Sequence, residues 1–163
     1  MRDTRQLTRA AILLTLALIF QSLRFIIPLP PVLSVFVIGV LVNSVLVFAA
    51  WRSVRAYAMA LSVVLPCVAY LQGQLPIPVL IPVVAIGNWI YIWLVSKYSS
   101  GKSCYLAPIA KAAAMYTMAI LVIQFFSMPT AFQKTVGFIM GFAQLVTGIA
   151  GILLARLAIK LVK

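Results

Sequence analysis

The side chains that could do chemistry in this chain are nearly all basic groups or amides. Asp3 is its only carboxylate, and the chain has no histidine and only two cysteines. Paired-carboxylate catalysis, a serine–histidine triad and a closed zinc site each need groups that this chain lacks. We therefore expect no catalytic residue, no metal and no cofactor. An enzyme built on Tyr, Lys or Cys alone is an alternative that no motif favours.

The remaining polar groups are candidates for binding. Asn88 falls near the middle of an apolar run, where an unpaired amide is costly, so it bonds either a neighbouring helix or a ligand. Arg24 and Lys134 either snorkel to lipid headgroups or converge on a cavity that attracts an anion. The expected substrate-binding residues are Arg24, Gln72, Gln74, Asn88, Gln124, Lys134 and Gln144.

The composition indicates that these groups are held in a membrane protein. Of the 163 residues, 65% are hydrophobic and 9% are charged, and the mean hydropathy is +1.18, which leaves too little polar surface for a soluble globule. A net charge of +12 is also found in proteins that bind nucleic acids. Because the basic residues lie in short gaps between apolar runs, however, they indicate membrane orientation, and we expect no nucleic-acid partner.

Six apolar runs are long enough to cross a bilayer, which takes about 17–25 residues each. Pro and Gly interrupt most of the gaps between them, as expected at helix ends. The sequence thus predicts an all-α integral membrane protein, with residues 1–163 forming one compact bundle of six transmembrane helices. The predicted spans are Thr8–Ile27, Val32–Trp51, Val54–Leu71, Val79–Val95, Tyr105–Phe126 and Phe132–Val162. The first run is too long for a signal peptide and lacks a small-x-small cleavage site.

The basic residues predict the orientation of this bundle. With the N-terminus inside, eleven of the 13 basic residues lie at cytoplasmic ends, and only Arg24 and Lys134 lie at outer ends. By the positive-inside rule both termini are then cytoplasmic. The eleven are Arg2, Arg5, Arg9, Arg52, Arg55, Lys97, Lys102, Lys111, Arg156, Lys160 and Lys163. Cys67 and Cys104 fall near opposite membrane faces and should not form a disulfide.

Small residues predict which helix faces pack closely. The last helix carries Gly137, Gly141, Gln144, Gly148, Gly151 and Ala155 within one sector, which we expect to face inward. Gln144 then bonds either a neighbouring helix or a ligand. The first helix has one face with Ala10, Ala17, Gln21 and Arg24, and a second face with Thr8, Ala11, Thr15 and Ser22. Either both faces pack within the bundle or one of them meets a partner chain.

The whole pattern resembles the substrate-binding S components of energy-coupling factor (ECF) transporters. Six short helices with both termini inside are typical of that family. The segment Thr8–Thr15 opens the first helix with basic and small residues, although the family's alanine-based motif is reduced here to Ala11-xxx-Thr15. The loop Pro28–Pro31 is shorter than the covering loop of many members. Leu71–Pro76 and Ile86–Asn88 are similar to the region of helices 3 and 4 in several members.

This resemblance implies a substrate-specific subunit in the bacterial plasma membrane that binds a vitamin-like or other small polar or anionic micronutrient from outside. It implies a membrane scaffold subunit and two cytoplasmic ATPases as partners, and a toppling motion that releases the ligand inside. The chain itself has no phosphate-binding loop motif. In this interpretation Thr8, Ala11, Thr15 and Ser22 face the scaffold, while Gln21 and Arg24 face the ligand.

Two other classes of membrane protein are alternatives. The first is a structural protein similar to the rod-shape protein MreD, which has a comparable size and number of spans and needs no ligand cavity. The second is an independent secondary transporter. Such carriers usually place an ionisable group in the membrane for ion coupling. Proton coupling is disfavoured here because the predicted spans contain no histidine and no carboxylate.

Overall fold

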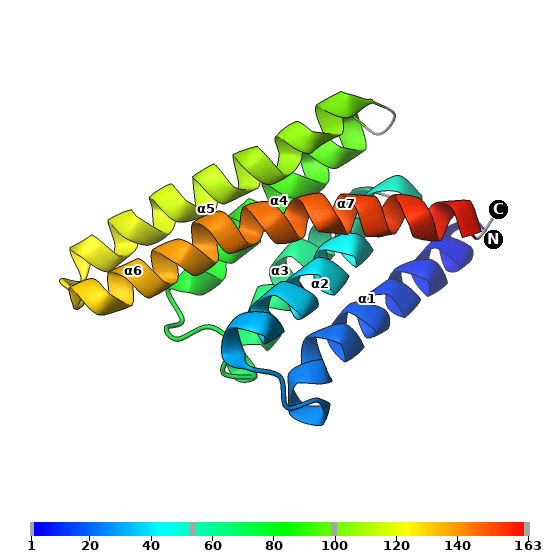
Figure 1. Cartoon of the computed structure of the whole chain (residues 1–163). Helices are drawn as coiled ribbons and strands as arrows, with labels where there is room; N and C mark the ends of the chain where they lie inside the picture. The colour runs from blue at the N-terminus through cyan, green and yellow to red at the C-terminus, as the bar shows by residue number, and fades with distance from the viewer. Residues whose placement is uncertain (1, 53–54, 99–100, 162–163) are drawn as a thin grey trace.

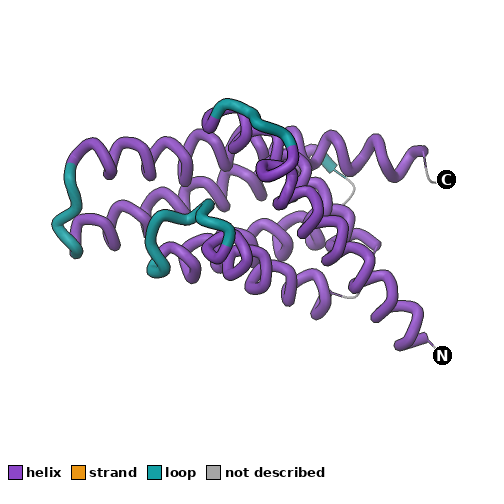
Figure 2. The backbone as a smooth tube through the Cα atoms, turned by 90° about the horizontal axis from the view of Figure 1, so that it is seen from below, coloured by secondary structure: helices purple, strands orange, loops and turns teal. Residues whose placement is uncertain are grey.

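The computed structural model describes residues 2–52, 55–98 and 101–161, and all regular structure within these ranges is helical (Figures 1 and 2). The all-α prediction is therefore confirmed. The elements in chain order are α1 (Arg2–Ile26), α2 (Pro31–Arg52), α3 (Arg55–Leu71), α4 (Leu80–Lys97), the 3₁₀ turn η1 (Lys102–Tyr105), α5 (Leu106–Phe125), α6 (Thr130–Phe138), the π-helical turn η2 (Ile139–Ala143) and α7 (Gln144–Leu161).

Five helical stretches are long and apolar enough to cross a membrane. They are Thr4–Ile26, Pro31–Arg52, Leu80–Lys97, Lys102–Phe125 and Thr130–Leu161. The exception is α3, which has 17 residues. At 1.5 Å per residue it is about 26 Å long, slightly short of the ~30 Å hydrocarbon core. Length and composition thus indicate a helical membrane protein with five clear spans and one shorter apolar helix.

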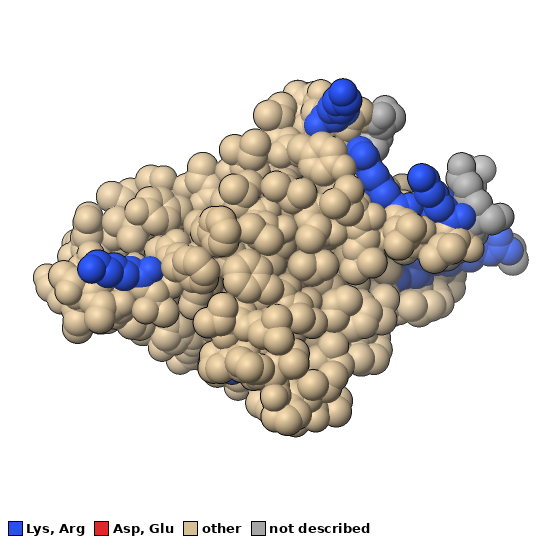
Figure 3. Space-filling view, in the orientation of Figure 1, with Lys and Arg blue, Asp and Glu red and all other residues tan. Residues whose placement is uncertain are grey.

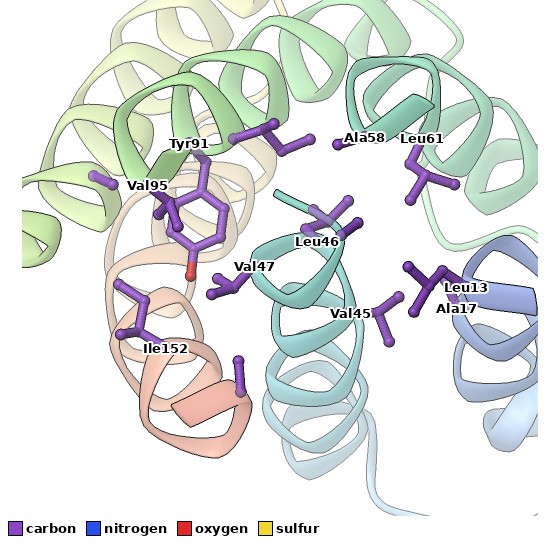
Figure 4. Packing of buried hydrophobic residues seen from close by; sticks show 14 of the residues in the cluster. Leu13, Ala17, Val45, Leu46, Val47, Ala58, Leu61, Tyr91, Val95 and Ile152 are labelled. Atoms are coloured by element: carbon purple, nitrogen blue, oxygen red, sulfur yellow. The ribbon is translucent and has the colours of Figure 1, made fainter. Parts of the chain in front are cut away.

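The most extensively packed helix is α2, which contacts α1, α3, α4 and α7 (Figure 4). Its buried side chains diverge: Val45 points toward Ala17 of α1, and Val47 points toward Tyr91 of α4. In contrast, α1 packs only along one edge and leaves most of its surface uncovered. Figure 2 shows α1 diverging from the other helices toward its N-terminal end.

The last helix is continuous from α6 through η2 to α7, as its single long apolar run predicts (Figure 1). Its small residues face inward, and this prediction is also confirmed. A Cβ placed on Gly151 would lie 2.7 Å from Cβ of Asn43 in α2, and one on Gly148 would lie 2.7 Å from Cβ of Pro108 in α5. Glycine is therefore required for the close approach of α7 to α2 and α5.

The helix ends differ from the predicted spans by a few residues. The largest difference is in α1, which begins at Arg2 rather than at Thr8. An apolar run marks only the part of a helix that lies in hydrocarbon, so the polar turns before it are not visible in the hydropathy pattern. The predicted limits at Val54 and Val162 lie outside the described residues.

Most described Lys and Arg side chains gather at the end of the molecule that holds the first turn of α1 and the last turn of α7 (Figure 3). The prediction that Lys111 lies with them is wrong, because this side chain is only 1% exposed and lies inside the bundle. One face of the start of α5 is covered, since Ala107 and Pro108 are buried, whereas Leu106 and Ile109 on the other face are exposed. Cys67 and Cys104 are both free, as expected.

Candidate functional site

A central cavity of about 250 Å³ lies between α1, α2, α3, α4, α5 and η2. Its lining begins at the end of the bundle that carries the 27–30 and 72–79 loops, where Pro31, Gly73 and Gln74 contribute, and reaches Asn43 near the middle of α2. Most of the lining residues are apolar, and the others carry amide, hydroxyl or cationic side chains. This combination of apolar walls and a few placed polar groups is typical of small-molecule sites.

A buried lysine forms the inner part of this cavity. The Lys111 Nζ donates a hydrogen bond of 2.7 Å to Oδ1 of Asn43. Asn43 Nδ2 in turn donates to Thr147 Oγ1 at 3.0 Å, and the Thr147 hydroxyl donates to the Ala143 carbonyl at 2.7 Å. Each donor in this chain has one acceptor, so the amide of Asn43 is held with its oxygen toward the ammonium.

Tyr91 covers another side of the same ammonium. The Nζ of Lys111 lies 5.0 Å from the centroid of the Tyr91 ring, within the range of a cation–π contact. The Tyr91 hydroxyl donates to the carbonyl of Gly148 at 2.6 Å, which fixes the ring between α4 and α7. An ammonium has three donors, and Asn43 is the one hydrogen-bond acceptor that the described residues offer it.

Three other polar groups line the cavity without a partner among the described residues. The side chains of Asn88 and Ser34 are 5% and 8% exposed, and neither makes a hydrogen bond to a described residue. The amide of Gln144, half-buried, is in the same state. Buried polar groups in folded proteins are almost always hydrogen-bonded, to water or ligand where no protein group serves. These three therefore mark places where a bound molecule or water is held.

The 72–79 loop is fastened over this cavity by a chain of amides. Gln72 Nε2 donates to Ser22 Oγ at 2.9 Å, and Gln74 Nε2 donates both to Gln72 Oε1 at 2.8 Å and to the Gln21 carbonyl at 2.9 Å. The side-chain amide of Gln21 is buried and donates to the carbonyl of Leu65, which precedes Pro66 in α3. The loop and the end of α1 thus form one wall.

The structure brings together four of the seven predicted binding residues. Arg24, Gln74, Asn88 and Gln144 all line the central cavity. Gln72 lies beside it, bonded to Gln74. The other two, Gln124 and Lys134, line a separate and more open groove along α5 and α6. Of the two alternatives for Arg24 and Lys134, convergence on one cavity is not found, because Lys134 lines the groove beside α5 and α6 and Arg24 lines the central cavity.

The cavity lining includes Gln21, which was expected to face the ligand, and several residues that the sequence analysis missed, above all Lys111. Lys111 lies among alanines in the run Ala110–Ala114, close to the predicted end of a helix. It was therefore counted among the basic residues that mark the cytoplasmic side. Pro108 and Met115 could have indicated its burial, because they are apolar and lie on the same helix face as Lys111. Asn43 and Ser34 also line the cavity.

The second face of α1 is divided. Thr8, Ala11 and Thr15 are exposed, and the two threonine hydroxyls are bonded within α1 to the Thr4 and Ala11 carbonyls. Ser22, by contrast, is half-buried and accepts the bond from Gln72. The predicted contact of this face with a scaffold stays a prediction, and Ser22 is the member of the face that bonds to the 72–79 loop.

No family model, no curated protein and no solved structure matches this chain. Within the described residues there is also no cluster of three His, Cys, Asp or Glu side chains that could hold a metal ion. The cavity groups themselves are an ammonium, a guanidinium, amides and a hydroxyl. These are binding groups, and the chemistry that they support best is the recognition of a polar solute.

Asn88 provides a direct test of the cavity as a binding site. We expect Asn88→Leu to raise the free energy of unfolding by about 1 kcal/mol, since a buried amide without a partner is replaced by an apolar group. The same substitution should weaken ligand binding at least about tenfold. Thermal unfolding of the purified protein in detergent, alone and with retained small molecules, checks both effects. A loss of stability equal to that of Asn43→Leu would show that Asn88 bonds within the protein.

Proposed function

We propose that this chain is the substrate-binding membrane subunit of an ECF-type importer that takes up a small polar micronutrient. The observation that carries the proposal is the central cavity, in which Asn88 and Ser34 are buried without described partners and Lys111 is buried beside neutral groups only. A structural membrane protein has no use for such groups, because each costs free energy unless water or a ligand satisfies it.

The proposed arrangement in the membrane has six crossings with both termini cytoplasmic. Its support is the gathering of basic side chains at one end of the molecule, which is the cytoplasmic end under the positive-inside rule (Figure 3). In this arrangement α3 crosses a locally thinned bilayer, which costs a fraction of a kcal/mol per Å of mismatch. The cavity then opens toward the outside, at the end with the 27–30 and 72–79 loops.

A subunit of this kind depends on partners for energy. The chain has no phosphate-binding loop motif, so ATP hydrolysis must be supplied by separate ATPases acting through a membrane scaffold. The proposed scaffold contact is the small-residue face of Thr8, Ala11 and Thr15 on α1, which is exposed and lies on the least covered helix of the bundle. Small side chains allow another helix to approach closely within lipid.

Co-purification tests this function. The chain, a scaffold subunit and two ATPases are expressed together, and the chain is captured by an affinity tag. We expect the wild-type chain to retain the other subunits, and Ala11→Leu to reduce the retained amount severalfold because the added side chain separates the helices. Ala113→Leu is the matched control, since it adds the same bulk to an exposed position on α5.

The outcomes are distinct. If the wild-type chain retains no scaffold or ATPase while a known S component does so in parallel, the proposed function fails. Capture of cell-wall synthesis proteins instead would favour the structural alternative. If Ala11→Leu and Ala113→Leu retain the partners equally well, the contact lies on a different surface of the chain.

A further inference from the structure

The central cavity contains a buried lysine with no acidic side chain near it to act as counter-ion when it is protonated. Lys111 is 1% exposed, and its neighbours Asn43 and Tyr91 are neutral. Asp3 is the only carboxylate side chain in the whole sequence, and it belongs to the first turn of α1, at the opposite end of that helix from Arg24. A buried ammonium is expensive without a counter-ion, even when one hydrogen bond to an amide is present.

The other groups of the cavity match the same ligand chemistry. Arg24 lines the outer part and adds a second cation near the mouth. Ser34 and Asn88 are buried in the lining, and their hydroxyl and amide groups, which can donate as well as accept, have no partner among the described residues. The cavity thus offers an excess of donors and positive charge, which is complementary to oxygen atoms that bear negative charge.

We propose that the ligand of the central cavity is a small carboxylic acid whose carboxylate binds the Lys111 ammonium as its counter-ion. This inference rests on the proposed function only in taking the cavity as the ligand site. A carboxylate is favoured over a phosphate because the interior holds one cation, whereas a phosphate monoester carries a charge of about −1.5 to −2 at neutral pH. The acid enters from the mouth, where Arg24 attracts it.

The size of the cavity limits the acid. The volume of the cavity is about 250 Å³. This is below the usual range of drug-sized pockets, about 300–1,000 Å³. A compact acid with one ring or a short chain fits, and a molecule with a bulky second ring system does not.

Matched pairs of probes test the charge requirement. Acetate, benzoate and nicotinate are each compared with the corresponding primary amide, which has nearly the same shape and no charge. Binding to the purified protein is measured by thermal shift and calorimetry at millimolar probe concentration and constant ionic strength. We expect the acids to stabilise the wild-type protein and the amides to have no measurable effect.

Variants locate the charge that binds the acid. We expect Lys111→Met to lower the affinity for the acids by roughly tenfold to a hundredfold, in line with a lost hydrogen bond to a charged group. Lys111→Arg keeps the charge and should bind better than Lys111→Met, which separates lost charge from misfolding. Lys102→Met is the control, because it removes an exposed charge from the turn just before α5 and should bind as the wild type does.

Four results would overturn the proposal. They are amides that bind as tightly as the acids, acids that bind Lys111→Met as tightly as the wild type, inorganic phosphate that binds more tightly than any acid, and no binding of any of the three acids to the wild type. The proposed function is judged separately by co-purification. Retained ATPases without acid binding refute only the carboxylate, and acid binding without ATPases refutes only the ECF-type importer.

Discussion

Asn43→Asp is expected to abolish acid binding and, at the same time, to stabilise the protein. Asn43 is the residue whose Oδ1 accepts the 2.7 Å bond from Lys111 Nζ. An aspartate at this place provides the missing counter-ion from within the chain, so the ammonium no longer needs one from a ligand. The affinity for carboxylates should fall at least about a hundredfold, because the bound acid would now face a negative charge.

The change in stability distinguishes this result from simple damage to the site. The second carboxylate oxygen of an aspartate accepts from the Thr147 hydroxyl, which lies 3.0 Å from the present amide nitrogen, once that hydroxyl turns away from the Ala143 carbonyl. We therefore expect the unfolding temperature of Asn43→Asp without ligand to rise. Asn43→Leu is the matched control, since it removes the acceptor without adding charge and should cost about 3–5 kcal/mol by leaving the ammonium unpaired.

These expectations can be contradicted in two ways. If Asn43→Asp binds benzoate with wild-type affinity, then Lys111 is not the group that holds the acid. If Asn43→Asp and Asn43→Leu are destabilised equally, a counter-ion for the Lys111 ammonium does not stabilise the protein. Thermal unfolding and calorimetry in the same detergent measure both quantities for all three proteins.

The sequence was sufficient to predict the helices, because each depends on local information. Long apolar runs separated by Pro and Gly predict all-α structure, and the glycines of the last helix predict its inward face. The π-helical turn η2 was not predictable in the same way. It inserts one extra residue into the helix beside the cavity, and such turns occur where tertiary contacts offset the weaker backbone hydrogen bonds.

The site was predicted only in part, and the reason is geometric. Asn88 and Gln144 were found because an amide in an apolar run is costly wherever it lies. Lys111 was missed because it follows closely after the predicted start of its helix at Tyr105. This short distance along the chain was taken to mean that the side chain lies at the membrane surface. The turn η1, in which Cys104 is the one buried residue, leads into α5, and its position depends on Arg156 of α7, which donates to the Gly101 carbonyl at 3.1 Å. A contact across 55 residues leaves no local pattern.

The largest loss of stability is expected at Gly151. A Cβ at this position would lie 2.7 Å from Cβ of Asn43 and 3.0 Å from the backbone nitrogen of Ser44, so α2 and α7 would have to separate. Backbone atoms cannot rotate away as a side chain can. We expect Gly151→Ala to lower the free energy of unfolding by about 1–3 kcal/mol and Gly151→Val by more than about 4 kcal/mol, as measured by unfolding in detergent.

Gly137 is the control for this prediction because it lies on the same helix against a neighbour that can move. A Cβ there would lie 3.2 Å from Cε2 of Tyr116, whose ring is 48% exposed and free to shift outward. Gly137→Ala should therefore change stability by no more than about 1 kcal/mol, the gain in helix propensity offsetting the small shift. Since Gly151 contacts Asn43, Gly151→Ala should also displace the acceptor of Lys111 and weaken acid binding. Equal effects at the two glycines would mean that α2 and α7 do not depend on close contact, and that the lysine is held by some other means.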